Sequence, residues 1–225
     1  MDLGIRQIHK TLAILCLAFL VPSLQAEQTV IQGYDDARDN YFYDRLYTDN
    51  IGESLYCGIN RPISAIGKQP SLEHVMPADW MAEYFGCPNR DCDNPTYKHA
   101  EGDLHNLWLA VKNINSSRSD NLFGEIPEGQ GESRFDYCPL FVRTYSPNAI
   151  VVEPRDSVKG NIARSLFYMR SEYGFDLKGM LPMLKRWNRF DPPGEHEHWR
   201  NERIHKLQGT RNKFIDNYHL GNSLE

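Results

Sequence analysis

A glutamate and a histidine stand side by side in the segment Ser71-Leu-Glu-His-Val-Met-Pro77, and a second polar segment, residues 101–119, follows later in the chain. Adjacent side chains on a strand point to opposite faces, so Glu73 and His74 cannot share one ligand but can act on adjacent atoms of one phosphate. A neutral imidazole, whose unperturbed pKa is near ~6.5, can take a proton from water. Mg²⁺ prefers oxygen ligands and keeps several waters, which suits the Glu73 carboxylate and the Asn115 amide oxygen. These side chains predict a phosphodiesterase site with one metal ion.

Each of these segments also has an ordinary structural interpretation. A Glu-His dipeptide is often a surface pair or a hydrogen-bonded histidine, and the run Asn-Ser-Ser-Arg at residues 115–118 is typical of a helix cap or turn. His198, Glu202 and His205 have the spacing of one helical face and could hold zinc, but a solvated polar face is the favoured interpretation. The site hypothesis therefore depends on the order and spacing of the two polar segments together.

Two strands and a helix are predicted to position the candidate side chains. Residues 72–75 and 105–110 are expected to be extended, and residues 111–120 predict a short helix rich in Asn and Ser. Residues 87–96 are crowded with Cys, Asn, Pro and Asp, which predicts a loop. Three side chains alternate and are expected to share one side of a strand: Glu101, Asp103 and His105. Strand, loop, strand and helix form the minimum frame of a small metal finger.

Helices and short strands are predicted to surround this frame. Glycines that follow periodic apolar runs indicate where two of the helices end. The expected helices cover residues 34–46, 158–173 before Gly174, 182–187, and 195–207 before Gly209, and short strands are expected at 54–57, 140–142 and 149–152. The chain has no internal repeat or low-complexity linker, so we expect one mixed α+β domain over residues 27–225.

The first 26 residues have the pattern of a secretory signal peptide. Arg6, His9 and Lys10 precede an apolar run, residues 12–21, that is too short to span a bilayer, and cleavage is expected after Ala26. A lipoprotein site at the cysteine within this run is disfavoured, because a leucine precedes it where a small residue is needed. We expect a periplasmic or secreted protein that has no membrane attachment after cleavage.

Four cysteines remain after that cleavage, an even set that favours two disulfides in an exported chain. Cys87 and Cys92 are close enough for a local bridge, which leaves Cys57 with Cys138, although three pairings are formally possible. A zinc site of all four cysteines is disfavoured because the CxxC spacing is missing.

The net charge of the chain is −5, with 25 Lys and Arg against 30 Asp and Glu. This balance argues against indiscriminate binding to polyanions. A nucleic-acid substrate would need basic contacts gathered on one face, for which the candidates are Arg118, Arg143, Lys159 and Arg164.

Several segments of the chain together resemble the endonuclease I family of exported bacterial nucleases, which have a ββα-metal (His-Me finger) site. The resemblance rests on Leu55-Tyr-Cys-Gly58, residues 72–77, 101–107 and 114–119, Val152-Glu-Pro-Arg155, residues 159–164, Trp187-Asn188 with Asp191-Pro-Pro193, and the run from Arg200 to Asp216. The combination is specific, whereas any one segment would be weak. One departure is Leu109, which stands where the family usually has proline and should alter the turn between strand and helix.

The resemblance implies a role for each candidate residue. His74 corresponds to the general base, and Glu73 and Asn115 correspond to the two metal ligands. Glu101 corresponds to a carboxylate near the metal waters that helps deliver a proton to the leaving 3′ oxygen, and Arg90 to an arginine that steadies the phosphate. The family also implies Mg²⁺, with Mn²⁺ or Ca²⁺ as substitutes, DNA and RNA cut with little sequence preference, and 5′-phosphorylated products. A monomer is expected.

Two other classes of protein stay open at this point. The chain could be an inactive module that binds nucleic acid or metal, or a different exported metal phosphoesterase that acts on small esters. A binding module would have no chemical need to keep Glu73, His74, Glu101 and Asn115 together, so the nuclease is the favoured hypothesis.

Overall fold

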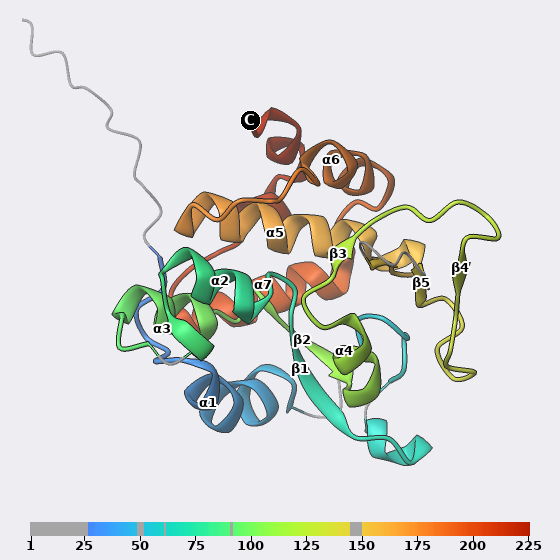
Figure 1. Ribbon diagram of the computed structural model, residues 1–225. Helices are drawn as coiled ribbons and strands as arrows, with labels where there is room; N and C mark the ends of the chain where they lie inside the picture. The colour runs from blue at the N-terminus through green and yellow to red at the C-terminus, as the bar shows by residue number, and fades with distance from the viewer. Residues whose placement is uncertain (1–26, 49–51, 61, 91, 145–149) are drawn as a thin grey trace, which may run out of the picture.

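The computed structural model describes residues 27–48, 52–60, 62–90, 92–144 and 150–225 (Figure 1). The predicted signal peptide lies outside these ranges. None of the helices within them combines the length and apolar character of a membrane span. Helices and two small sheets make up the described chain, so the α+β class is confirmed.

A two-stranded antiparallel sheet and the helix after it carry the two polar segments. Strand β1 (Pro70–His74) pairs with β2 (Leu107–Val111), with Glu73 opposite Trp108. Every residue of β2 is buried, and the chain passes from it directly into α4 (Lys112–Arg118). Figure 1 shows β1, β2 and α4 next to one another near the middle of the molecule. These elements agree with the strands and helix expected from the sequence.

The segment between the two strands is largely helical. It contains α2 (Ala78–Tyr84), the short 3-10 helix η4 (Pro88–Arg90) and α3 (Pro95–Glu101). The Asn94 side chain caps α3 by accepting hydrogen bonds from two backbone N–H groups of its first turn, at 2.9 and 3.2 Å. Proline at the first helical position fits this helix start.

The expected alternation of Glu101, Asp103 and His105 on a strand is wrong. Glu101 is the last residue of α3, whereas Asp103 and His105 are buried in the turn before β2. The Asp103 carboxylate accepts hydrogen bonds there from the Gln208 amide at 2.8 Å and the Tyr173 hydroxyl at 2.8 Å. These contacts join Asp103 to α5 and α7 and are therefore structural.

The C-terminal helices form a layer in which α5 and α6 run side by side across one side of Figure 1. The elements are α5 (Lys159–Tyr173), α6 (Leu181–Phe190), α7 (Glu195–Gln208), α8 (Lys213–Asp216) and η6 (Tyr218–Ser223). Gly174 and Gly209 end α5 and α7 in the left-handed conformation, at φ 79° and 85°, as predicted. A Cβ at Gly160 would stand 1.8 Å from the Asp191 carbonyl oxygen, so the contact of α5 with the end of α6 requires glycine.

The remaining elements lie at the N-terminus and in a second sheet. Helix α1 (Tyr34–Asp36) continues into the π-helix η1 (Ala37–Leu46), and two further 3-10 helices are η3 (Ile63–Ile66) and η5 (Asp156–Val158). The second sheet has the order β3 (Leu122–Phe123), β6 (Val151–Glu153), β5 (Val142–Thr144) and β4 (Gly131–Glu132). The strand expected at residues 54–57 is instead a turn beside an isolated bridge between Glu53 and Asn60.

Both expected disulfides are present. Cys87 is bonded to Cys92, and Cys57 is bonded to Cys138. The first closes a local loop that includes η4, and the second joins a turn before β1 to the segment before β5.

The expected basic face is wrong for two of its four members. Arg118 and Arg164 are buried and form ion pairs with Glu73 and Glu197. Lys159 lies between two carboxylates of its own neighbourhood. A guanidinium inside the protein needs a partner for its charge, so Arg118 and Arg164 balance buried carboxylates and are not free to bind a polyanion.

Candidate active site

A cavity of about 400 Å³ opens beside the end of β1, and all five candidate residues contribute to its wall. They come from four elements: β1 supplies Glu73 and His74, η4 supplies Arg90, α3 supplies Glu101 and α4 supplies Asn115. Side chains that complete the wall include Tyr34, Ser71, Asp79, Lys112, Ser116 and Ser119. The fold thus brings together residues that are far apart in the sequence.

Glu73 is held by two buried groups on one of its oxygens. The Tyr56 hydroxyl donates to Oε1 at 2.6 Å, and the Arg118 Nη1 atom lies 3.1 Å from the same oxygen. Burial raises the pKa of Glu73 to about 7, while Arg118 and the Tyr56 hydrogen bond act in the opposite direction. A cation bound at the carboxylate would also favour the charged form.

Asn115 is oriented by acceptors on β1. Its Nδ2 atom donates to the Ser71 Oγ at 2.8 Å and to the Leu72 carbonyl oxygen at 2.7 Å. Because a carbonyl oxygen can only accept, the amide nitrogen must face β1, and Oδ1 is the Asn115 atom available to a ligand. Glu73 and Asn115 therefore offer oxygen donors at one cavity, a donor set that fits a hard divalent cation.

A transition-metal site has less support. The described ranges contain no group of three or more His, Cys, Asp and Glu side chains placed to hold a metal. On α7, Glu202 forms ion pairs with Lys206 at 3.3 Å and Arg211 at 2.6 Å. This agrees with the solvated polar face that the sequence favoured over zinc for that helix.

His74 has a defined tautomer in the neutral form. Its Nε2 atom is 2.8 Å from the main-chain carbonyl oxygen of Glu101, which can only accept, so Nε2 carries the hydrogen and Nδ1 carries the lone pair. Burial lowers the pKa of His74 to about 4. The Tyr34 ring packs against the imidazole with centroids 5.3 Å apart. A neutral imidazole in a fixed orientation can accept a proton at Nδ1.

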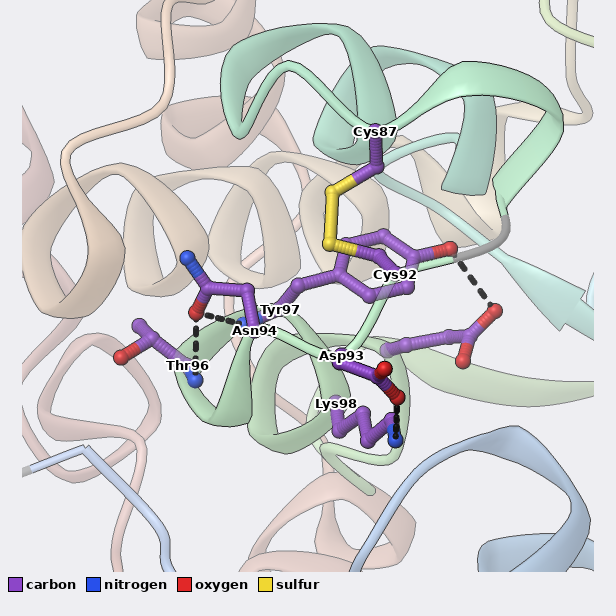
Figure 2. Close-up of a disulfide and its surroundings, with 8 residues drawn as sticks. Cys87, Cys92, Asp93, Asn94, Thr96, Tyr97 and Lys98 are labelled. Carbon is purple, nitrogen blue, oxygen red and sulfur yellow. Dashed lines mark hydrogen bonds and ion pairs between the residues drawn. A yellow bond between two sulfur atoms is a disulfide. The ribbon is translucent and has the colours of Figure 1, made fainter.

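Glu101 presents its side chain to the cavity from the end of α3. The Tyr97 hydroxyl donates to Oε1 at 3.0 Å, and the Tyr34 backbone N–H lies 3.4 Å from Oε2. Figure 2 shows Tyr97 beside the disulfide and near Asn94, which caps the same helix. The position of Glu101 thus depends on the start of α3 as well as on its end.

Arg90 lies inside the loop that the Cys87–Cys92 disulfide closes. Asn89 and Arg90 both have left-handed backbones, at φ 54° and 60°, which is uncommon for residues other than glycine. The Arg90 Nε atom is 3.2 Å from the Asp79 carboxylate, and both side chains are about half exposed. An arginine in this position can exchange its carboxylate partner for a phosphate at the cavity.

Four tyrosine and arginine contacts around the site were missed from the sequence. Tyr56 and Arg118 hold Glu73, Tyr97 holds Glu101, and Tyr34 packs on the histidine. Two of them stand in segments already singled out, Tyr56 in Leu55-Tyr-Cys-Gly58 and Arg118 in the Asn-Ser-Ser-Arg run. The partners of Tyr34, Tyr56 and Arg118 are at least 17 positions away, so no local spacing indicates those contacts. Tyr97 and Glu101 have the i, i+4 spacing of one helical face, a signal that could have been used had a helix been expected there.

Comparison with known proteins identifies the chain as an exported enzyme that hydrolyses nucleic acids. It belongs to the endonuclease I family, whose model matches residues 34–219. An extracellular deoxyribonuclease of Aeromonas hydrophila is 30% identical over 93% of this chain and 98% of its own length. A periplasmic deoxyribonuclease of the same organism is 32% identical over 64% of this chain and 62% of its own length.

A ribonuclease is also among the relatives. The extracellular ribonuclease of Bacillus subtilis (strain 168) is 32% identical over 61% of this chain and 51% of its own length. Family membership implies a divalent metal cofactor, in agreement with the two oxygen donors at the cavity.

Proposed function

We propose that this chain is a periplasmic or secreted endonuclease that uses Mg²⁺ to hydrolyse phosphodiester bonds of DNA and RNA and leaves 5′-phosphorylated products. The observation that carries the proposal is a neutral His74 with its lone pair on Nδ1, beside two oxygen ligands, Glu73 and Asn115. In this proposal β1, β2 and α4 act as a ββα-metal finger within a nuclease domain of residues 27–225. Mn²⁺ or Ca²⁺ would substitute for Mg²⁺.

The mechanism begins with a water between His74 and the scissile phosphate. Nδ1 of His74 takes a proton from this water, and the hydrogen bond from Nε2 to the Glu101 carbonyl steadies the ring as it becomes charged. The oxygen of the water attacks phosphorus opposite the bond to the 3′ oxygen. Mg²⁺ held by Glu73 and Asn115 would neutralise charge on the phosphate and the leaving oxygen.

The remaining roles fall to Glu101 and Arg90. The Glu101 carboxyl, next to the ligands, delivers a proton to the leaving 3′ oxygen through a water. Arg90 moves from Asp79 to the phosphate and steadies its added negative charge, which is the usual function of arginine in phosphoryl chemistry. Attack on phosphorus and departure of the 3′ oxygen break the P–O3′ bond, so one fragment ends in a 3′ hydroxyl and the phosphate stays on the 5′ oxygen of the other.

The proposed substrates follow from the relatives and from the surface of α4. Deoxyribonucleases and a ribonuclease are among the similar proteins. Lys112, Ser116 and Ser119 are exposed at the cavity and offer a cation and hydroxyls to flanking phosphates. Contacts to phosphate and sugar carry no direct base information, so little sequence preference is expected.

Replacement of the base tests this proposal. His74→Ala should lower cleavage of supercoiled plasmid in Mg²⁺ by at least the ~10² to 10⁴-fold typical of a lost acid-base group, while DNA binding persists. His198→Ala, an exposed histidine on α7, is the matched control and should keep full activity. Full activity of His74→Ala would overturn the assignment, and turnover of a nitrophenyl phosphate without plasmid cleavage by the wild type would indicate a small-ester phosphoesterase.

A further inference from the structure

We infer that Tyr56 and Arg118 are positioning residues that restrict Glu73 to coordination through one oxygen and thereby favour Mg²⁺ over Ca²⁺. The inference rests on the proposed function, because it takes Glu73 and Asn115 as the metal ligands. It concerns which divalent ion the site prefers, a property that follows neither from the types of the five candidate residues nor from the relatives.

Oε1 of Glu73 already has two donors. The Tyr56 hydroxyl and the Arg118 guanidinium both contact this atom, and all three side chains are 1% exposed. A cation at Oε1 would have to lie next to the guanidinium, and in a buried place this like-charge contact is strongly unfavourable. Oε2 is therefore the oxygen that a metal ion can use.

Arg118 cannot easily leave Oε1. Its Nη1 and Nη2 atoms donate to the main-chain carbonyl oxygens of His74 and Val75, each at 2.8 Å, and its guanidinium stacks on the Phe123 ring at 4.4 Å from the centroid. These contacts fix the guanidinium plane at the end of β1. A movement of Arg118 away from Glu73 would leave two carbonyl groups without these donors.

The second proposed ligand is restricted in the same way. Asn115 precedes Arg118 by three positions on α4, so the two side chains lie on one face of the helix. The hydrogen bonds from Nδ2 to Ser71 and Leu72 leave Oδ1 as the single oxygen that Asn115 can offer. The protein would thus supply one oxygen from each of two side chains.

Two single-oxygen ligands distinguish the two ions. Mg²⁺ requires a near-octahedral shell, keeps several waters and commonly binds through one or two protein groups. Ca²⁺ takes more ligands at longer distances and often binds a carboxylate through both oxygens. Because Oε1 is occupied, Ca²⁺ loses that bidentate contact with Glu73, whereas Mg²⁺ loses nothing.

The experiment is calorimetric titration of the mature, oxidised chain with Mg²⁺ and with Ca²⁺ in the absence of nucleic acid. In Tyr56→Phe one donor to Oε1 is lost while the ring is kept, so the ratio of the Ca²⁺ to the Mg²⁺ dissociation constant should fall about tenfold relative to wild type. Arg118→Met removes the positive charge beside Oε1 and keeps a long unbranched side chain, and the ratio should fall in this variant too.

The matched control is Tyr168→Phe, since the Tyr168 hydroxyl is buried and lies 3.0 Å from a carboxylate oxygen of Asp103, away from the cavity. This variant should keep the wild-type ratio. An unchanged ratio in a folded Tyr56→Phe or Arg118→Met protein would overturn the inference. Absence of metal binding by the wild type would instead overturn the proposed metal ligands, so the two failures are distinguishable.

Discussion

Loss of the Cys57–Cys138 disulfide should lower stability more than loss of the Cys87–Cys92 disulfide, whereas loss of the Cys87–Cys92 disulfide should lower activity more. We compare two variants in which both cysteines of one bridge become serine. The Cys57–Cys138 bridge joins residues 81 positions apart and the Cys87–Cys92 bridge joins residues 5 apart. From the loop-closure entropy of the unfolded chain, removal should cost about 4.5 kcal/mol for the first bridge and about 2 kcal/mol for the second.

Activity should follow the position of each bridge, because Arg90 lies inside the loop of the short one. Without the Cys87–Cys92 bond, the left-handed backbone at residues 89 and 90 loses its closest restraint, and Arg90 leaves the cavity. A displaced phosphate-binding group of this kind costs about 10²-fold in rate. Neither Cys57 nor Cys138 lines the cavity, so removal of this bridge should lower the rate of the folded enzyme less than removal of the Cys87–Cys92 bridge does.

Urea unfolding measures the stability of each variant, and initial rates of plasmid cleavage under conditions in which each variant is folded measure its activity. Glutathione-free oxidising buffer keeps the remaining bridge intact in each variant. The reasoning fails if the variant without Cys87–Cys92 cleaves at the wild-type rate, or if it is the less stable of the two.

Two further perturbations probe the burial and capping described above. Burial lowers the pKa of His105 to about 3, below the unfolded value of ~6.5. Between these two pKa values the unfolded chain binds a proton that the folded chain does not. The free energy of unfolding should therefore fall by about 1.4 kcal/mol for each pH unit from pH 6.5 down to 3. Chemical denaturation across this range should show a smaller slope of unfolding free energy against pH in His105→Gln than in the wild type, and an unchanged slope in the exposed control His198→Gln. Equal slopes in the wild type and both variants would contradict this expectation. Asn94→Ala should destabilise the protein by about 1 kcal/mol through loss of the α3 cap, whereas Asn113→Ala, at an exposed position of α4, should change stability little, as thermal unfolding would measure.

Strands β1 and β2, helix α4 and the ends of α5 and α7 were predictable because their signals are local, whereas α3, which carries Glu101, was not predicted. The apolar run of β2, the proline after β1 and the glycines after α5 and α7 define those elements within a few residues. Cysteine spacing favoured the pairing that is observed, out of three that were formally possible. Glu73, His74, Glu101 and Asn115 were found in the two polar segments, Arg90 was proposed from the family resemblance alone, and the cavity brings all five together.

What the sequence could not provide depends on contacts between distant segments. Asp103 alternates with its neighbours as on a strand, but its hydrogen bond to Gln208 spans 105 positions and belongs to a turn. Arg118 resembled a surface cation, yet it is buried against Glu73 on another element. Whether a charged side chain faces solvent or an interior partner is decided by packing that a single sequence does not display.

The hydrogen bond of His74 to the main chain of Glu101 separates two functions at one residue. The carbonyl that orients the imidazole belongs to the backbone, so it is present whatever side chain residue 101 carries. The identity of the proton donor can therefore change without altering the tautomer of the base. Position 101 is the place where a designer could alter how the leaving group is protonated and leave the attack on phosphorus as it is.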